Sequence, residues 1–217
     1  MGVNIQICNV KKTYKNKIIL DDCSYSFHEN KTYLIYGPNG SGKTTLLRIL
    51  ALLEKPDDGD VVYFFKNFRL KKNLDLYRRI TYVQTNVVAF NGTVYENISY
   101  GLKIRNFSKK EIENRVNNIL HLFNLYEKAN EDAKLLSSGE IRKLGLARAF
   151  VLQPEVLFLD EPTNNLDEKN LELIKNIIIE YKKNNGCIIV IATLDISFFE
   201  NFSDEILTLK EGKLIKL

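Results

Sequence analysis

A glycine-rich segment at 37–44, Gly-Pro-Asn-Gly-Ser-Gly-Lys-Thr, constrains the fold of this chain more than any other feature. It lies between an apolar, strand-like run at 33–36 and a helix-like run at 45–50. Glycines let a loop turn tightly enough to point successive backbone amides inward, and the helix that follows directs the positive end of its dipole to the same place. The segment therefore predicts a phosphate-binding loop for a nucleotide.

The residue types in this loop predict individual contacts to the nucleotide. We expect the Lys43 ammonium to reach the β- and γ-phosphates and the Thr44 hydroxyl to bind Mg²⁺. The alternative is a glycine-rich turn that matches the pattern by coincidence, but the flanking strand and helix favour the phosphate loop. The other nucleotide-binding residues that we expect are Gly37, Asn39, Gly40, Ser41, Gly42 and Thr45.

Later apolar runs predict a parallel α/β core that the loop belongs to. The runs at 156–160 and 186–192 are strand-sized and continuously apolar, and a helix-like stretch at 168–183 separates them. Strands that alternate with helices in this way form parallel sheets with helices against them. The chain is therefore expected to have an α/β fold with a mostly parallel central sheet.

Three further segments surround this core. Residues 1–30 alternate apolar and polar side chains, which predicts an antiparallel β flank. Between about 87 and 148 the pattern is helical, and 112–123 places its apolar residues on one helix face. The tail at 205–217 predicts a β-hairpin that turns at Glu211-Gly212.

An acidic pair, Asp160-Glu161, ends the predicted strand at 156–160. A carboxylate at such a strand tip can hold Mg²⁺ through water, and Glu161 is then placed to polarise an attacking water. The alternative is that the pair caps the turn before Pro162. Gln84 follows a predicted strand at 80–83 and offers an amide to the metal or the water, the alternative being an ordinary surface glutamine.

A short polar segment, Leu-Ser-Ser-Gly-Glu at 136–140, precedes a predicted helix at 141–152. It presents a hydroxyl and backbone amides at a helix N-terminus, which is a second anion-binding device. A plain helix cap is the alternative for this segment when it is considered alone.

Composition excludes several classes of protein. The 217 residues are 45% hydrophobic, which suffices for a core, but the longest apolar runs fall far short of the roughly 20 residues of a membrane helix. The N-terminus lacks the pattern of an export signal, and the three cysteines have no metal-ligand spacing, so we expect a cytoplasmic protein with reduced thiols. A net charge of +4 without a long basic run predicts no nucleic-acid partner.

Taken in order, the phosphate loop, Gln84, 136–140, Asp160-Glu161 and Asn-Asn-Leu-Asp at 164–167 resemble the ATP-binding subunits of ABC transporters. This resemblance covers the chain from about residue 3 to its end. It implies a P-loop NTPase core with a mostly parallel sheet, an N-terminal antiparallel β flank and an inserted α-helical subdomain. The implied division is a single nucleotide-binding domain at 1–217, in which 1–86 and 149–217 form the ATP-binding core and 87–148 forms the helical subdomain.

The resemblance also implies cofactors and residue roles. ATP and Mg²⁺ would be the cofactors, with Tyr14 stacked on adenine. Glu161, Gln84 and Lys43 would be the catalytic residues. Thr44, Gln84 and Asp160 would serve the metal.

The partners implied by the resemblance include a second ATP-binding subunit, identical or different, in a head-to-tail dimer with two ATP molecules. Residues acting on the partner's phosphate loop would be Ser137, Ser138, Gly139, Glu140 and Asp167. Residues 87–107, with Gln84, would form a groove for a helix of the transmembrane permease subunits. The chain would then lie on the cytoplasmic face of the cell membrane, and an importer would add a solute-binding protein.

The sequence departs from the family pattern at three positions. Leu194, in Thr193-Leu194-Asp195, stands where the family has a switch histidine, and losing such a preorganised polar contact commonly costs ~10²-fold or more in rate. We therefore expect a slow Mg-dependent ATPase. Ser138 replaces a glycine and Glu140 replaces a glutamine, and Ser138 would weaken dimer closure if its backbone needs a positive φ.

The function that these features favour is an ATP-hydrolysing subunit that energises solute transport through separate membrane subunits. Residues 92–98 and 100–103 are similar to importers of small solutes, including oxyanions such as tungstate or molybdate. One alternative is a regulatory or degenerate ATP-binding module with negligible turnover. Another is a soluble, non-transport ABC ATPase, although such relatives generally carry a coiled-coil insertion or two fused ATPase domains.

Overall fold

The computed structural model describes residues 2–217, which divide into two compact units. The first unit comprises the chain up to Tyr82 together with Pro154–Glu161 and Ile179–Leu217. The second unit comprises Val83–Gln153 and Pro162–Ile178. These units are defined by compactness alone. They do not test the division into an ATP-binding core and a helical subdomain at 86/87 and 148/149, which stays a prediction.

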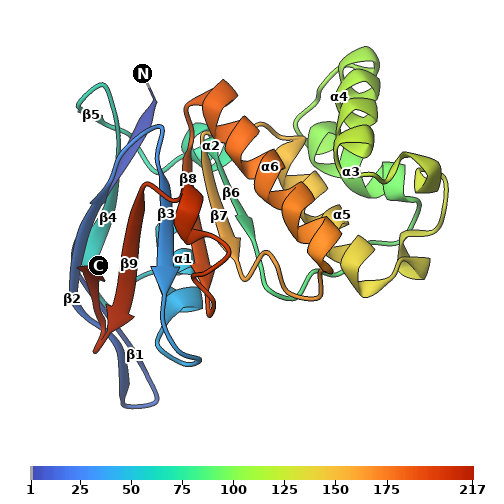
Figure 1. Ribbon diagram of the computed structural model, residues 1–217. Helices are drawn as coiled ribbons and strands as arrows, with labels where there is room; N and C mark the ends of the chain where they lie inside the picture. Colours follow the sequence, from blue (N-terminus) through green and yellow to red (C-terminus); the bar gives the residue numbers. More distant parts are fainter. Residues whose placement is uncertain (1) are drawn as a thin grey trace. The chain divides into compact units, whose positions relative to one another are not determined.

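A six-stranded sheet forms the centre of the first unit, with the strand order β10-β9-β3-β8-β7-β6 (Figure 1). The strands β3, β8 and β7 pair in parallel, and β9 runs parallel to β3 while β10 returns antiparallel to β9. Strands buried on both faces read as continuous apolar runs, which is why the sequence revealed them. The strands are β3 (Thr32–Tyr36), β6 (Ile80–Val83), β7 (Val156–Asp160), β8 (Ile188–Thr193), β9 (Glu205–Lys210) and β10 (Lys213–Lys216).

The register of this sheet brings the ends of its parallel strands, and the polar residues that follow them, to one edge. Tyr36 pairs with Thr193, and Asp160 pairs with Ala192, so β3, β8 and β7 end at the same edge. The glycine-rich loop leaves β3 at this edge and enters α1 (Lys43–Leu50), which buries its apolar residues in the core of the first unit. The loop and the acidic pair therefore lie side by side although more than a hundred residues separate them.

A four-stranded antiparallel sheet, ordered β2-β1-β4-β5, completes the first unit. Alternate residues at the start of β1, Val3, Ile5 and Ile7, are buried, as the predicted antiparallel flank requires. The strands β4 and β5 and the short helix α2 (Leu74–Arg79) were not anticipated from the sequence. The strand bounds are β1 (Val3–Tyr14), β2 (Lys17–Phe27), β4 (Asp58–Phe65) and β5 (Phe68–Arg69).

The second unit is helical, and each of its helices α3, α4 and α5 begins with a capping box. In these boxes Thr93, Ser108 and Ser137 cap the helix while a glutamate three residues later binds back to the cap. The predicted apolar face is buried at Ile112, Val116 and other positions of α4. The helices are α3 (Val94–Ile104), α4 (Lys109–Leu122), α5 (Ser138–Phe150) and α6 (Glu168–Asn185), which begins here and ends in the first unit.

Neither a helix that could span a membrane nor a metal-binding cluster of His, Cys, Asp and Glu is found within residues 2–217. No helix there is long and apolar enough to cross a membrane. None of the described His, Cys, Asp and Glu side chains gather in groups of three or more that could hold a metal ion. Cys23 and Cys187 are buried, and burial raises their pKa values to about 11 and about 12. Both thiols are therefore protonated and unreactive at neutral pH.

Glu205, at the start of β9, is expected to make stability depend on pH. Hydrogen bonds from Lys216, Lys31 and Tyr25 lower its pKa from 4.5 to about 2. Because the folded-state pKa is the lower one, this stabilisation is present above the unfolded value and is lost as the pH falls toward 2. We expect Glu205→Gln to lower the free energy of unfolding near neutral pH by about 1 kcal/mol, since solvent screens part of the charge.

Urea titrations of the wild type and Glu205→Gln across this acidic range check the prediction. The difference in unfolding free energy should shrink as the pH falls. A difference that stays constant with pH would show that Glu205 stabilises the fold through packing alone.

Candidate nucleotide-binding site

The glycine-rich loop enters α1 through a residue that only glycine can occupy. Gly42 precedes the helix with a φ of 104°, in the left-handed region. A Cβ at this position would lie 2.7 Å from Ile19 Cγ2 and 3.2 Å from the Ile19 carbonyl oxygen. Both the backbone conformation and the contact with β2 therefore require the glycine.

Lys43 lies inside the loop rather than in solvent. Its Nζ donates hydrogen bonds to the carbonyl oxygens of Gly37 at 2.6 Å and Pro38 at 3.3 Å, and lies 3.8 Å from Glu161 Oε1. Burial lowers the pKa of Lys43, while Glu161 and Asp160 oppose that shift. The ammonium thus lies between the loop backbone and the Glu161 carboxylate.

Asp160 ends β7 with its two carboxylate oxygens in different surroundings. Its Oδ2 accepts hydrogen bonds from Thr44 Oγ1 at 2.9 Å and from the Tyr82 hydroxyl at 3.1 Å. Its Oδ1 is buried and accepts no hydrogen bond from any described residue. A buried carboxylate oxygen without a partner is costly, so this atom fits a ligand that is a cation or a proton donor.

These residues fit Mg²⁺ by their chemistry. Magnesium prefers oxygen ligands and is commonly held by one or two carboxylates together with water and substrate phosphates. Asp160 Oδ1 and the Thr44 hydroxyl are such oxygens beside a phosphate-binding loop.

Glu161 adopts a backbone conformation that few non-glycine residues adopt. Its φ is 49°, and its amide donates to the Ala192 carbonyl oxygen at 2.9 Å. Burial raises the pKa of Glu161, while the Leu194 amide and Lys43 act in the opposite direction. Left-handed residues of this kind cost of order 1 kcal/mol and cluster at functional sites. The Glu161 carboxylate lies 3.3 Å from the Leu194 amide and 3.8 Å from Lys43 Nζ.

Leu194 contributes its backbone, not its side chain, to this arrangement. Its amide lies 3.3 Å from Glu161 Oε2 and donates a hydrogen bond to it, while the side chain is 41% exposed. The Thr193 hydroxyl donates to the Asp195 carbonyl oxygen and accepts from the Asp195 amide. These hydrogen bonds fix the turn that contains Leu194. Position 194, where the resemblance implies a switch histidine, is thus adjacent to Glu161 and carries an aliphatic side chain.

Tyr14 lies at the end of β1, and the residue is 42% exposed. Its hydroxyl bonds to Glu54, and Lys12 Nζ lies 5.4 Å from the ring centroid. An exposed ring is available for stacking, but the adenine contact stays a prediction.

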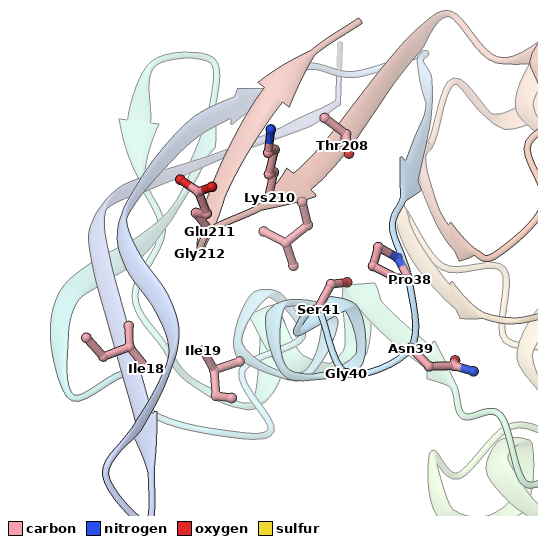
Figure 2. A pocket seen from close by; sticks show the side chains of 11 residues that line it. Ile18, Ile19, Pro38, Asn39, Gly40, Ser41, Thr208, Lys210, Glu211 and Gly212 are labelled. Atoms are coloured by element: carbon pink, nitrogen blue, oxygen red, sulfur yellow. The ribbon is translucent and has the colours of Figure 1, made fainter.

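A cavity of about 510 Å³ borders the outer side of the loop (Figure 2). Figure 2 shows Pro38 and Ser41 on one side of this hollow and Ile18 and Ile19 of β2 on another. The β9–β10 hairpin closes it with residues 208–212. Asn39, Gly40 and Ser41, three of the predicted loop residues, therefore line a space large enough for part of a nucleotide.

In the second unit, the segment 136–140 forms the N-terminus of α5, which begins at Ser138. The predicted start at 141 was wrong because the Ser137–Glu140 capping box carries the helix back to the polar residues. Ser138 has no positive φ, so its Cβ causes no backbone strain here. The expected conformational cost of replacing a glycine at this position is therefore absent.

Glu140 is held as an anion at this helix end. Its Oε2 accepts from the Ser137 amide at 2.9 Å, and its Oε1 lies 2.9 Å from Lys128 Nζ. Burial alone would raise the pKa of Glu140, but the hydrogen bonds from Lys128 and Ser137 outweigh it and lower the pKa to about 2. Lys128 was not anticipated as a site residue.

Gln84 and Asp167 lie in the second unit, and both make hydrogen bonds within it. Gln84 Nε2 donates to the Asn86 carbonyl oxygen at 2.7 Å. The buried Arg142 of α5 donates to the carbonyl oxygens of Gln84 at 3.1 Å and Thr85 at 2.6 Å. Asp167 Oδ1 accepts from the Asn170 amide at 2.8 Å and so caps α6. Arg142 was missed, because the carbonyl oxygens that it binds lie 58 and 57 positions away in the sequence.

Sequence comparison assigns the family. The profile of the family described as "ABC transporter" matches residues 20–164. A tungstate uptake system ATP-binding protein from Peptoclostridium acidaminophilum is 34% identical over 212 residues, which are 98% of this chain and 97% of the relative. This chain belongs to the ABC transporter ATP-binding family. The resemblance predicted from the motifs is thereby confirmed.

Solved structures of ABC ATP-binding proteins share the fold. A dimeric ATP-binding cassette, MJ0796, bound to ADP and Pi has a TM-score of 0.86 and 28% identity, covering 98% of this chain and 97% of that one. CbiO1 from Clostridium perfringens has a TM-score of 0.83 and 26% identity, covering 99% and 88%. The predicted α/β fold, with a mostly parallel sheet, an antiparallel β flank and inserted helices, is confirmed.

Some ABC relatives are much longer than this chain. The sulfate/thiosulfate import ATP-binding protein CysA of Anthoceros angustus is 33% identical over 99% of this chain, but the match spans only 56% of the relative. This chain therefore corresponds to only part of such proteins.

Proposed function

We propose that this chain is the ATP-hydrolysing subunit of an ABC transporter and energises solute transport through separate membrane subunits. The observation that carries the proposal is the grouping of Lys43, Thr44, Asp160 and Glu161 at one edge of the central sheet. Several relatives are named as ATP-binding proteins of import systems, which favours import as the direction of transport. The relative named for tungstate uptake matches over nearly its whole length, which favours an oxyanion as the transported solute.

In this mechanism the loop amides and Lys43 bind the β- and γ-phosphates of ATP, with Asn39, Gly40 and Ser41 lining the approach. Thr44 and Asp160 would hold Mg²⁺, which when bound neutralises charge that develops on the transferring phosphoryl group. Glu161 orients the attacking water and accepts its proton, and its raised pKa suits a base of this kind. Gln84 completes the set of groups that serve the metal or the water.

The second proposed component is a head-to-tail dimer. The N-terminus of α5 at Ser137, Ser138 and Gly139 offers amides and a hydroxyl to phosphates held by the partner, and Asp167 lies across the same interface. A Cβ at Gly139 would be 3.2 Å from the Asn165 carbonyl oxygen, so the two predicted trans segments of one chain are in contact. Transmembrane permease subunits would dock at 87–107 on the cytoplasmic face of the membrane, and an importer would add a solute-binding protein.

Leu194 favours one further candidate, a regulatory ATP-binding module with negligible turnover. Its aliphatic side chain cannot donate a hydrogen bond to a γ-phosphate. Glu161, held by the Leu194 amide, favours a slow enzyme over an inactive one.

Binding of a fluorescent ATP analogue to the purified chain tests the first step of the proposal. We expect Lys43→Ala to weaken binding about 10- to 100-fold, the usual effect of losing hydrogen bonds to a charged group. Lys183→Ala, on the exposed side of α6, is the matched control and should bind as the wild type does. Equal affinities for wild type and Lys43→Ala would contradict a nucleotide site at this loop.

Glu140→Gln tests the proposed dimer. Glutamine can keep the capping hydrogen bond to Ser137 while it removes a negative charge from the helix end that would face the partner's phosphates. We expect ATP-dependent dimerisation to tighten about fivefold, which corresponds to about 1 kcal/mol of relieved repulsion. Sedimentation measures the effect, with Glu113→Gln, at an exposed position of α4, as the control. Weaker dimerisation in Glu140→Gln alone would oppose this assignment.

A further inference from the structure

Tyr82 is a polar residue at the site that neither the motifs nor the mechanism above employs. It is the third residue of β6, and its ring packs against the core of the first unit. Its hydroxyl does not point to solvent but donates to Asp160 Oδ2 at 3.1 Å. A strand residue in an apolar run gave no signal of this contact, because its partner is 78 residues away in the sequence.

The two donors on Asp160 come from different elements and converge on one oxygen. Thr44 Oγ1 belongs to α1 and lies 2.9 Å from Oδ2, while the Tyr82 hydroxyl belongs to β6. A carboxylate oxygen has two lone pairs, so Oδ2 is fully used by these two hydrogen bonds. Oδ1, buried and without a partner among the described residues, is then the oxygen left for a ligand.

A single donor would hold this carboxylate less well. The terminal torsion of an aspartate is broad and roughly two-fold, so one hydrogen bond lets the two oxygens rotate or exchange. The second bond, from a rigid ring in a central sheet, holds Oδ2 in place and so fixes the orientation of Oδ1. Groups that orient a metal ligand in this way typically change metal affinity 10- to 100-fold when they are lost.

We propose that Tyr82 is a positioning residue for the metal site, because its hydroxyl anchors Asp160 Oδ2 and thereby presents Oδ1 to Mg²⁺. The inference rests on the proposed function, since it assumes that Asp160 holds the metal of a Mg-nucleotide. It adds a residue that the family motifs of this chain do not contain. The hydroxyl acts through Asp160 and does not touch the nucleotide.

Tyr82→Phe is the direct test, because it removes one oxygen and leaves the ring that packs in the core. A fluorescent ATP analogue is bound to protein that has been freed of metal and transferred to chelator-free buffer, and Mg²⁺ is then titrated while fluorescence reports the tighter complex. We expect the metal-free affinity to stay unchanged and the Mg²⁺ concentration at half effect to rise about 10-fold or more. Tyr77→Phe, a tyrosine of α2 that is 45% exposed, is the matched control and should titrate as the wild type does.

Two outcomes would overturn the inference alone. One is a Mg²⁺ midpoint of Tyr82→Phe equal to that of the wild type. The other is an equal loss of affinity with and without Mg²⁺, which would show that the hydroxyl supports only the fold. If the wild type itself showed no nucleotide binding that Mg²⁺ strengthens, the proposed function would fall and the inference with it.

Discussion

The Glu161→Gln variant is expected to bind ATP as the wild type does and to hydrolyse it about 10²- to 10⁴-fold more slowly. Glutamine can still accept the hydrogen bond from the Leu194 amide, so the turn at 161 should be preserved. It cannot take a proton from water at neutral pH. The substitution therefore separates binding from hydrolysis.

The consequence should be a dimer that retains ATP. Size exclusion of Glu161→Gln with Mg-ATP is expected to show a dimer, and nucleotide extracted from that peak should be ATP rather than ADP. Asp195→Asn, which alters a nearby exposed carboxylate, is a suitable control and should leave the nucleotide hydrolysed. A strictly monomeric Glu161→Gln at high ATP would count against Ser137 and Gly139 acting on the partner's site.

Restoring a histidine at position 194 is expected to raise turnover about tenfold or more. The Leu194 side chain is 41% exposed, so an imidazole can be accommodated without repacking the core. Its backbone amide already donates to Glu161, so position 194 lies next to the proposed catalytic residue. A preorganised donor at this point would stabilise charge on the transferring phosphoryl group.

Leu194→Phe is the matched control, since it adds a ring that cannot donate a hydrogen bond. Rates of phosphate release under saturating Mg-ATP compare the three proteins. An increase in the histidine variant only would identify Leu194 as the defect in the site. A similar increase in both variants, or none in either, would mean that hydrolysis here uses another arrangement of groups.

The sequence predicted those parts of the fold in which local pattern and tertiary environment agree. The strand at 156–160 was predicted with the bounds it has, because β7 is buried on both faces and reads as a continuous apolar run. The hairpin of β9 and β10 turns at Glu211-Gly212 as predicted, since both residues adopt a positive φ there. The region 51–79 was left unassigned, because β4 and β5 are stabilised mainly by pairing with β1 and with each other.

The site was predictable only as far as its residues belong to local motifs. Lys43, Thr44, Asp160 and Glu161 were named from short segments, and the register of β3, β8 and β7 brings those segments together. Contacts between distant segments had no such signal. The bond of Tyr82 to Asp160 and that of Arg142 to the Gln84 carbonyl join residues separated by 78 and 58 positions.

The most direct test of the central claim is phosphate release from Mg-ATP by the purified wild-type chain, measured beside Glu161→Gln from a parallel preparation. We expect a slow rate in the wild type that EDTA abolishes and that the variant lacks. Identical rates in the two proteins, or a wild-type rate that persists without Mg²⁺, would contradict hydrolysis at this site.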